Sequence, residues 1–289
     1  MTINQSDNQI RSIRTMAAPA LPDRRRVVGP AETFVPELAT SEAPLPLTDK
    51  RADGRGFDTL RSICASRFIL VTFTLGLPCA SDASAGVIEH ARGSFYMEVG
   101  STKVMCAVYG PRPPQRPRFF SEQGMLDCCV TWAPFASARR KLGFKDSDEQ
   151  ALAATIESAL VDSVRLDEYP KLSVDLYVTV LEDGGAVEAA AITCAAGALA
   201  HAGIALYDTV VASSAGIVQD RILMDCDANE QKRVQGSLLV SMMPSINETT
   251  YVDSRGEVDW NTLIEATEMC LDACIRTRKI IDEALVAAL

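Results

Sequence analysis

Apolar residues along the chain follow two spacings, an alternation in short segments and a near-helical repeat in three longer ones. Alternation is typical of strands with one buried face, and a repeat of three to four residues is typical of helices. The strands that we expect cover residues 94–99, 103–109, 128–135, 172–181, 209–213, 222–224, 238–243 and 249–252. The helices that we expect cover residues 147–163, 186–202 and 260–287. This order of elements predicts an α+β fold built from two βα-type halves.

The most informative stretch joins the strand at 172–181 to the helix at 186–202 through Asp183, Gly184 and Gly185. Glycine has no Cβ atom, so the backbone there can approach another group closely. The helix consists almost entirely of small side chains. We therefore expect this unit to lie against a ligand or a neighbouring sheet. Asp183 is interpreted as a turn residue that bonds nearby backbone in preference to a metal ligand.

The first fifty residues form a separate region, with six of the fourteen prolines and little periodic hydrophobicity. Such a composition predicts a tail that is mostly disordered. Within it, the segment 23–38 carries the run Arg24-Arg25-Arg26, which is read either as an element for nuclear import or RNA contact or as a solvated charge run. The folded domain is predicted to cover residues 51–289.

Residues 67–84 do not fit their surroundings. The tripeptide Cys-Ala-Ser occurs just before this segment, at 64–66, and again inside it, at 79–81. Removing these eighteen residues would join 61–66 directly to 85–95. We expect an inserted segment here. The alternative is an ordinary buried strand that carries Ile69, Val71 and Phe73.

Charge limits the functions that are open to the chain. Its formal net charge is −10, and phosphate affinity comes from positive charge, so a generic nucleic-acid coat is excluded and only local basic clusters could contact RNA. The polar first residues show no signal-peptide pattern, and the apolar run 68–77 is half of what a bilayer requires. We expect no membrane span.

Cysteine and histidine usage argues against a metal centre. The nine cysteines form no Cys-x-x-Cys pair, and the histidines are limited to His90 and His201. No zinc-binding set can be assembled at the usual spacings. Reduced structural thiols are expected, and His201 is read as a helix C-terminal histidine in preference to a general base.

Three segments resemble the ribonuclease PH family. They are the entry motif with Arg51, Asp53, Gly54 and Arg55, the predicted hairpin at 93–112, and the strand–turn–helix unit at 169–208. The resemblance implies the ribonuclease PH fold, with mixed sheets and helices packed on them. It also implies assembly into a six-membered ring.

Members of this family that cleave RNA with inorganic phosphate need arginines to grip that anion and carboxylates to hold a divalent ion. Catalytic relatives carry a Thr-Arg pair after the glycines, whereas this chain has Ala186 and Val187. They also place an arginine where the helix after the basic loop opens, whereas residues 145–149 read Lys-Asp-Ser-Asp-Glu. Catalytic relatives often show Asp-x-Asp in this strand, whereas here Asp175 is followed by Leu176 and Tyr177.

The free energy lost with the missing arginines decides whether the chain is interpreted as catalytic. A charge-assisted hydrogen bond contributes roughly 1.5–3 kcal/mol, so losing two costs about 3–6 kcal/mol, on the order of 10²–10⁴ in rate. We therefore predict a catalytically inactive relative with no catalytic residues, no metal site and no cofactor. An active phosphorolytic 3′→5′ exoribonuclease is the alternative.

Two basic loops are the candidates for RNA contact. One carries Arg112, Arg116 and Arg118, and the other carries Arg139, Arg140 and Lys141. In the family these loops approach the central pore of the ring, where arginines can contact the backbone of single-stranded RNA without reading its sequence. Simple solvated loops are the alternative reading.

The leader 23–38 narrows the resemblance to a non-catalytic ring subunit of the eukaryotic RNA exosome. The implied role is support of 3′→5′ RNA processing and degradation in the nucleus, including the nucleolus, and in the cytoplasm. The implied partners are other ribonuclease PH-like ring subunits, cap subunits with OB-fold or KH domains, and single-stranded RNA. A free-standing protein-interaction module is a rival from another class.

Overall fold

The computed structural model describes residues 60–61, 83–113, 123–137, 140, 147–218 and 221–288, and the structural statements below concern these residues. The tail 1–50 and most of the expected insertion lie outside them, although Ala83 and Ser84 are described. The boundary of the folded domain at residue 51 therefore stays a prediction.

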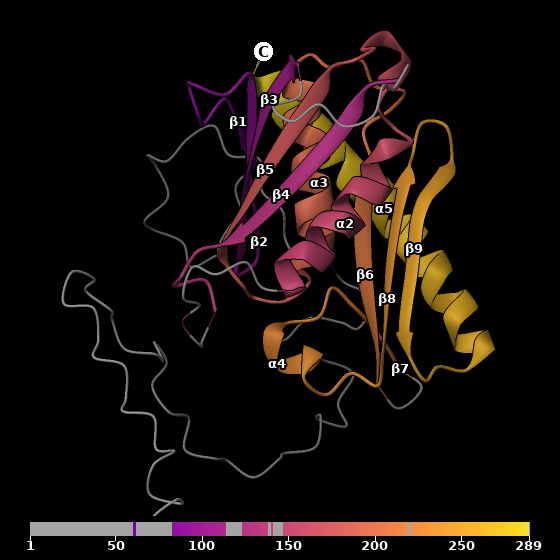
Figure 1. The fold of residues 1–289 in the computed structure, drawn as a ribbon. Helices are drawn as coiled ribbons and strands as arrows, with labels where there is room; N and C mark the ends of the chain where they lie inside the picture. Colours follow the sequence, from indigo (N-terminus) through magenta and orange to yellow (C-terminus); the bar gives the residue numbers. More distant parts are fainter. Residues whose placement is uncertain are drawn as a thin grey trace, which may run out of the picture.

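Two sheets and the helices between and behind them make up the fold (Figure 1). The first sheet has the order β1-β2-β3-β5-β4, and the second has the order β7-β6-β8-β9. Among the strand pairs of the described residues, β4–β5 is parallel and the others are antiparallel. The strands of the first sheet are β1 (Ala83–Ala85), β2 (Gly93–Val99), β3 (Thr102–Arg112), β4 (Met125–Trp132) and β5 (Ser173–Glu182). Those of the second are β6 (Val211–Val218), β7 (Arg221–Met224), β8 (Gly236–Met243) and β9 (Glu248–Gly256).

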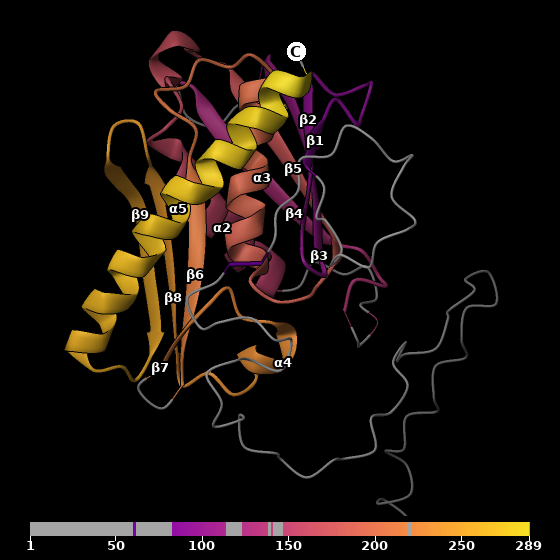
Figure 2. The ribbon, with the colours of Figure 1, turned by 180° about the vertical axis from the view of Figure 1, so that it is seen from behind.

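The helices are α2 (Ser147–Val161), the 3₁₀ turn η1 (Leu166–Glu168), α3 (Val187–His201), α4 (Ala228–Gln231) and α5 (Trp260–Ala288). Helices α2 and α3 lie between the two sheets, and α5 crosses the outer face of the second sheet (Figures 1 and 2). The predicted α+β class is thereby confirmed. No helix in the described part of the chain is both long and apolar enough to cross a bilayer.

Helix α3 shows why its sequence consists of small residues. Twelve of its fifteen residues are buried, because it packs on β2 and β3 on one side and on β6 on the other. A Cβ atom on Gly197 would lie 3.0 Å from the Phe95 ring, so even one added carbon would press on the sheet. Of the two readings of this unit, a neighbouring sheet accounts for the helix.

The alternating pattern of the strands also follows from packing. In β5, Val174, Leu176, Val178 and Val180 face the core, whereas Asp175, Tyr177 and Thr179 point to the other face of the sheet. A second core cluster lies between the second sheet and α5, and it includes Leu238, Val240, Ala266, Cys270 and Ala273. The seven cysteines within the described ranges are free thiols, and burial raises the pKa of Cys128 and Cys270 to about 12.

His201 ends α3, as predicted, and its Nδ1 atom accepts a hydrogen bond of 3.3 Å from the backbone N–H of Ser94. The imidazole thus joins the C-terminal end of α3 to the start of β2. This contact gives His201 a structural part in the fold.

A carboxylate behind the second sheet gives the fold a dependence on pH. Arg278 of α5 donates to Asp208 Oδ1 at 2.6 Å, and the backbone N–H of Ser245 donates to Asp208 Oδ2 at 2.8 Å. Burial works to raise the pKa of Asp208, but the hydrogen bond and the charge of Arg278 outweigh it, so this pKa is lowered. A lowered carboxyl pKa adds stability above about pH 4, and this is lost as the pH falls further.

Replacing Asp208 by Asn should therefore flatten the loss of stability on acidification. At neutral pH the variant should lose about 1–3 kcal/mol, because the Arg278 guanidinium loses the Asp208 carboxylate and keeps its ion pair with Asp282. Urea unfolding of both proteins between pH 3 and pH 7 measures the effect. Asp167→Asn is a matched control, since Asp167 lies at the surface and accepts a bond from the exposed Gln123. Parallel pH profiles for wild type and Asp208→Asn would contradict the assignment.

Candidate functional site

A cavity of about 360 Å³ lies where the starts of α2 and α3 face the second sheet. Two helix starts lack the arginines that grip phosphate in catalytic relatives, and residues from both of them line this cavity. Asp148 enters from the first turn of α2, and Ala186 and Val187 enter from the start of α3. The structure thus brings together two segments about forty residues apart. The remaining wall comes from β4, β6, β8 and β9 together with residues near α4.

The charges on this wall are mostly negative. Asp148, Asp183, Glu188 and Asp253 line the cavity, and among the described lining residues Arg255 is the sole cation. Arg255 donates from Nη1 to Glu188 at 2.9 Å and lies with Nη2 2.7 Å from Asp253. The charge of Glu188 is the main cause of the raised pKa of Arg255. The guanidinium of Arg255 is therefore already matched to two carboxylates, and an added anion would meet net negative charge from the lining residues that the structure describes.

This wall predicts that inorganic phosphate does not bind here. Millimolar orthophosphate should leave the midpoint of thermal unfolding where an equal ionic strength of sodium chloride leaves it. A ligand at 100 times its dissociation constant would add about 2.7 kcal/mol, which corresponds to a shift of roughly 5–10 °C for a fold of this size. Differential scanning calorimetry of the purified protein measures the midpoint. A saturable rise with phosphate and none with chloride would contradict this reading of the cavity.

The turn before α3 has the geometry expected of Asp183 as a turn residue. Its Oδ1 atom accepts the backbone N–H of Gly185 at 3.2 Å. Gly185 has φ +98°, and Ala186, the N-cap of α3, has φ +52° in the left-handed region. In the described part of the molecule, no group of three His, Cys, Asp or Glu side chains is placed to hold a metal ion.

Glu149 differs from its sequence-based interpretation. In the sequence it stands beside Asp148 in the run 145–149, where catalytic relatives place an arginine. In the structure Glu149 is buried, and its Oε1 atom accepts the backbone N–H of Trp132 at 3.0 Å. This side chain ties α2 to the end of β4, because the helix turns it toward the sheet and away from the cavity. Lys145 and Asp146 lie outside the described residues.

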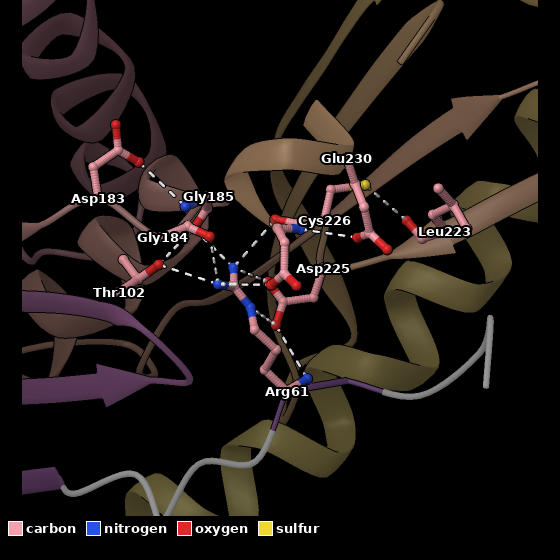
Figure 3. A network of polar contacts seen from close by, with 10 residues as sticks. Arg61, Thr102, Asp183, Gly184, Gly185, Leu223, Asp225, Cys226 and Glu230 are labelled. Atoms are coloured by element: carbon pink, nitrogen blue, oxygen red, sulfur yellow. Dashed lines mark hydrogen bonds and ion pairs between the residues drawn. The ribbon is translucent and has the colours of Figure 1, made fainter. Parts of the chain in front are cut away.

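Behind the glycine turn lies a buried network centred on Arg61 (Figure 3). The guanidinium donates from Nη1 to the carbonyl of Gly184 at 2.9 Å and from Nη2 to the carbonyl of Gly185 at 2.7 Å. It also donates from Nε and Nη2 to the two carboxylate oxygens of Asp225, at 2.9 and 2.8 Å. Thr102 completes the set, since its hydroxyl accepts from Nη1 of Arg61 at 3.2 Å and donates to Gly185 O at 2.7 Å.

The network explains how a charged side chain can be 6 % exposed. Burial works against the charge of Arg61, but the hydrogen bonds and charge of Asp225 outweigh it, so the pKa of this guanidinium is raised. Arg61 fixes the carbonyls of the turn that forms one wall of the cavity. Sequence reasoning missed Arg61, because it lies outside the entry motif that ends at Arg55.

The predicted RNA-contact residues fall in different settings. Arg112, at the end of β3, forms an ion pair with Asp175 of β5, and its Nε atom lies 2.7 Å from Asp175 Oδ2. The hydrogen bond to Asp175 is the main cause of the raised pKa of Arg112. Arg140 is half-buried. Arg116, Arg118, Arg139 and Lys141 lie outside the described residues, so the two loops stay a prediction.

Arg112 lies on the face of the first sheet opposite the core, which no helix of the described residues covers. A groove of about 460 Å³ lies there, and Tyr109 and Tyr177 form an edge-to-face pair in it with ring centroids 5.6 Å apart. Asp175, which sequence comparison treated as a remnant of a metal site, serves as the partner of Arg112. The pair lies on the sheet face opposite the core, because neighbouring strand residues alternate between faces.

Comparisons with known proteins identify the family to which this fold belongs. A family model described as the 3′ exoribonuclease family, domain 1 (RNase PH), matches residues 81–205. The chain is similar to the exosome complex component MTR3 of Homo sapiens, at 32 % identity over 92 % of this chain and 95 % of that one. It is also similar to the exosome complex component RRP41-like of Arabidopsis thaliana, at 32 % identity over 81 % of this chain and 84 % of that one.

Solved structures show the same fold. Rice (Oryza sativa) Rrp46 matches with a TM-score of 0.67 at 22 % identity, covering 81 % of this chain and all of that one. A chain of the Archaeoglobus fulgidus exosome with RNA bound to the active site matches with a TM-score of 0.66 at 20 % identity, covering 80 % of this chain and 92 % of that one.

The chain is a member of the RNase PH family of 3′ exoribonuclease-like proteins. Within that family it is homologous to exosome ring components. The subunit type that its leader resembles, mRNA-transport-regulator-three or MTR3, is found among its relatives in human, mouse and Schizosaccharomyces pombe. The predicted family and fold are therefore confirmed.

Proposed function

We propose that this protein is a non-catalytic structural subunit of the RNA exosome core ring. The observation that carries the proposal is the acidic cavity at the paired starts of α2 and α3, where the one described guanidinium is already held by Glu188 and Asp253. A site that transfers to phosphate has to attract that anion and stabilise charge on it. The acidic residues described on this wall would instead repel phosphate.

Similarity to MTR3 over nearly the whole chain supports the ring assignment. Its partners would be other RNase PH-like subunits beside it and OB-fold or KH cap subunits on one face. Degradation of RNA in the 3′→5′ direction would be carried out by nucleases attached to the ring. Such a protein would work where the exosome works, in the nucleus, including the nucleolus, and in the cytoplasm. Its acidity fits a ring whose pore alone is basic.

A nuclease assay separates this proposal from the alternative of an active phosphorolytic exoribonuclease. The purified chain, alone and in a ring with its partners, is incubated with a 5′-labelled oligoribonucleotide, magnesium and orthophosphate. No nucleoside diphosphate should be released by the chain alone. In the ring, Asp148→Asn should leave whatever release the partners produce unchanged. Shortening of the RNA by the isolated chain only when phosphate is present would overturn the proposal.

Assembly is tested separately. Affinity purification of the tagged protein from its own cells should recover the other ring subunits, and the isolated chain should be aggregation-prone without them. Apolar side chains on α5, such as Trp260 at 69 % and Val286 at 71 % exposure, are consistent with a chain that is incomplete alone. Sedimentation of the isolated chain as a stable monomer, with no ring subunits recovered, would favour a free-standing interaction module.

Contact with RNA at the pore of the ring is the most specific part of the proposal. Arg112 and Arg140 are the candidates that fall within the described residues. Arg112→Gln together with Arg140→Gln should reduce ultraviolet crosslinking of single-stranded RNA to this subunit in the assembled ring. Arg165→Gln is the matched control, since Arg165 is an exposed arginine paired with Glu168 in the 3₁₀ turn. Equal crosslinking in all three proteins would favour solvated loops without an RNA role.

A further inference from the structure

The first two residues of strand β1, Ala-Ser, also occur eighteen residues earlier in the chain. The strand reads Ala83-Ser84-Ala85, and the dipeptide Ala65-Ser66 precedes the expected insertion. Removing residues 67–84 therefore leaves Ala65-Ser66-Ala85, which has the same sequence as β1. Removing 65–82 produces the same polypeptide. The described strand would be intact in a chain that lacks these eighteen residues.

The register of the first sheet shows where the shortened chain would lead. β1 pairs antiparallel with β2, with Ala83 opposite Met97 and Ala85 opposite Phe95. Continuing this register backwards along the shortened chain places Ile63 opposite Val99, at the end of β2. Two residues further back, it places Arg61 opposite Ser101, in the turn between β2 and β3.

Arg61 lies at that place in the structure. Its Nη1 atom is 3.2 Å from Thr102 Oγ1, the residue after Ser101. A Cβ atom built on Gly100, the residue before Ser101, would lie 2.7 Å from Arg61 Cδ. Three residues connect Arg61 to β1 in the shortened chain, which is the number that an unbroken strand requires. In the full chain, residues 62–82 separate the same two neighbours.

The burial of Ala83 and Arg61 also agrees with one continuous strand in the shortened chain. Ala83 is buried on the core face, and alternation places Ile63 and Arg61 on that face in the shortened chain. Arg61 is indeed buried. In the sequence of the full chain, the residue two positions before Ala83 is Ser81 and not an isoleucine.

A small cavity lies beside this position. Its volume is about 30 Å³, and Met97, Val99, Ala189 and Ala190 contribute apolar wall. An isoleucine on the core face opposite Val99 would point toward these residues. Polar side chains, among them Ser213, Asp225 and Thr277, form another part of the wall. Filling the apolar side of such a space with hydrocarbon stabilises a core.

We propose that residues 67–84 are an insertion that the fold does not use, and that the chain without them is the form that folds as the ring subunit. Arg61, Ser62, Ile63 and Cys64 then continue β1 backwards as one strand along β2. This inference stands on the register, the repeated sequence and the position of Arg61. It does not depend on whether the protein is catalytic.

The native protein provides a direct test. Trypsin cleavage of the form without 67–84 yields the peptide SICASAGVIEHAR, whereas the full chain yields SICASR and a long peptide that begins at Phe68. Mass spectrometry of the protein isolated from its own cells should detect the joined peptide. Detection of SICASR and the peptide from Phe68, with no joined peptide, would overturn the proposal.

Two deletion variants test the register itself. The variant lacking 67–84 should unfold at a temperature roughly 5 °C or more above that of the full chain, because a long connection is removed and Ile63 is buried. A matched variant lacking 62–79 has the same length but connects Arg61 to Ala83 through Ala80, Ser81 and Asp82. It should unfold below the first variant. Equal midpoints for the two variants, or a lower midpoint for the first than for the full chain, would overturn the register.

Discussion

Replacing Arg61 by methionine should lower the free energy of unfolding by about 3–5 kcal/mol. The methionine keeps most of the side-chain volume but removes every donor. Asp225, with its side chain 10 % exposed, would keep a buried charge without its cation. The carbonyls of Gly184 and Gly185 would also each lose a hydrogen bond to the guanidinium. Urea unfolding followed by circular dichroism measures the change.

Charge and geometry can be separated at this position. Arg61→Lys keeps the charge but cannot bond Asp225 and both carbonyls at once, because an ammonium group lacks the planar fork of a guanidinium. It should recover only part of the loss. Arg165→Met is the matched control, since it breaks the exposed pair with Glu168 and should cost no more than about 1 kcal/mol. Equal losses in Arg61→Met and Arg165→Met would show that the network contributes little.

Local patterning predicted most of the elements because most of the chain alternates or repeats in agreement with its burial. The helix expected at 186–202 corresponds to α3 at Val187–His201, and the hairpin of β2 and β3 was expected at 94–109. The predicted ends of strands were wrong where a strand is buried on both faces and its apolar residues do not alternate with polar ones. Strand β6 runs to Val218, well past the expected end at 213, because both of its faces are covered, one by α3 and the other by α5.

The candidate site could be predicted only in part. The absence of arginine at Asp148, Ala186 and Val187 can be read from the sequence, since relatives mark those positions. Arg255 and Asp253 come from β9, nearly seventy residues after Ala186, and no local signal connects them to the cavity. The pair of Arg61 and Asp225 is separated by 164 residues and depends on the packing of the two sheets.

These two groups of residues have different consequences for function. The residues on the cavity wall decide which anions can enter, and the charged ones that the structure describes there are mostly acidic. The network behind the wall decides whether the turn keeps its shape, and it is fully bonded. For the structural ring subunit proposed above, the wall would account for the missing chemistry, and the network would keep the shape of the turn without it.

Replacing Gly185 by alanine tests how strictly that geometry is enforced. The residue has φ +98°, which L-residues rarely adopt, and an added Cβ atom would lie 2.3 Å from the Cys226 carbonyl oxygen and 2.7 Å from the Ala228 nitrogen. Both are backbone atoms, so neither can move aside as a flexible side chain would. We expect a loss of about 2–5 kcal/mol, from backbone strain of about 1–2 kcal/mol and overpacking of about 1–3 kcal/mol.

Gly203 supplies the control, because it has φ +68° with no atom within 4 Å of an added Cβ. Gly203→Ala should therefore cost only the strain, about 1–2 kcal/mol. The difference between the two variants in urea unfolding isolates the close approach between the glycine turn and the segment after β7. In the assembled ring, Gly185→Ala should also reduce incorporation of the subunit, whereas Gly203→Ala should be incorporated normally. Equal losses of stability in the two variants would mean that the two segments can move apart at little cost.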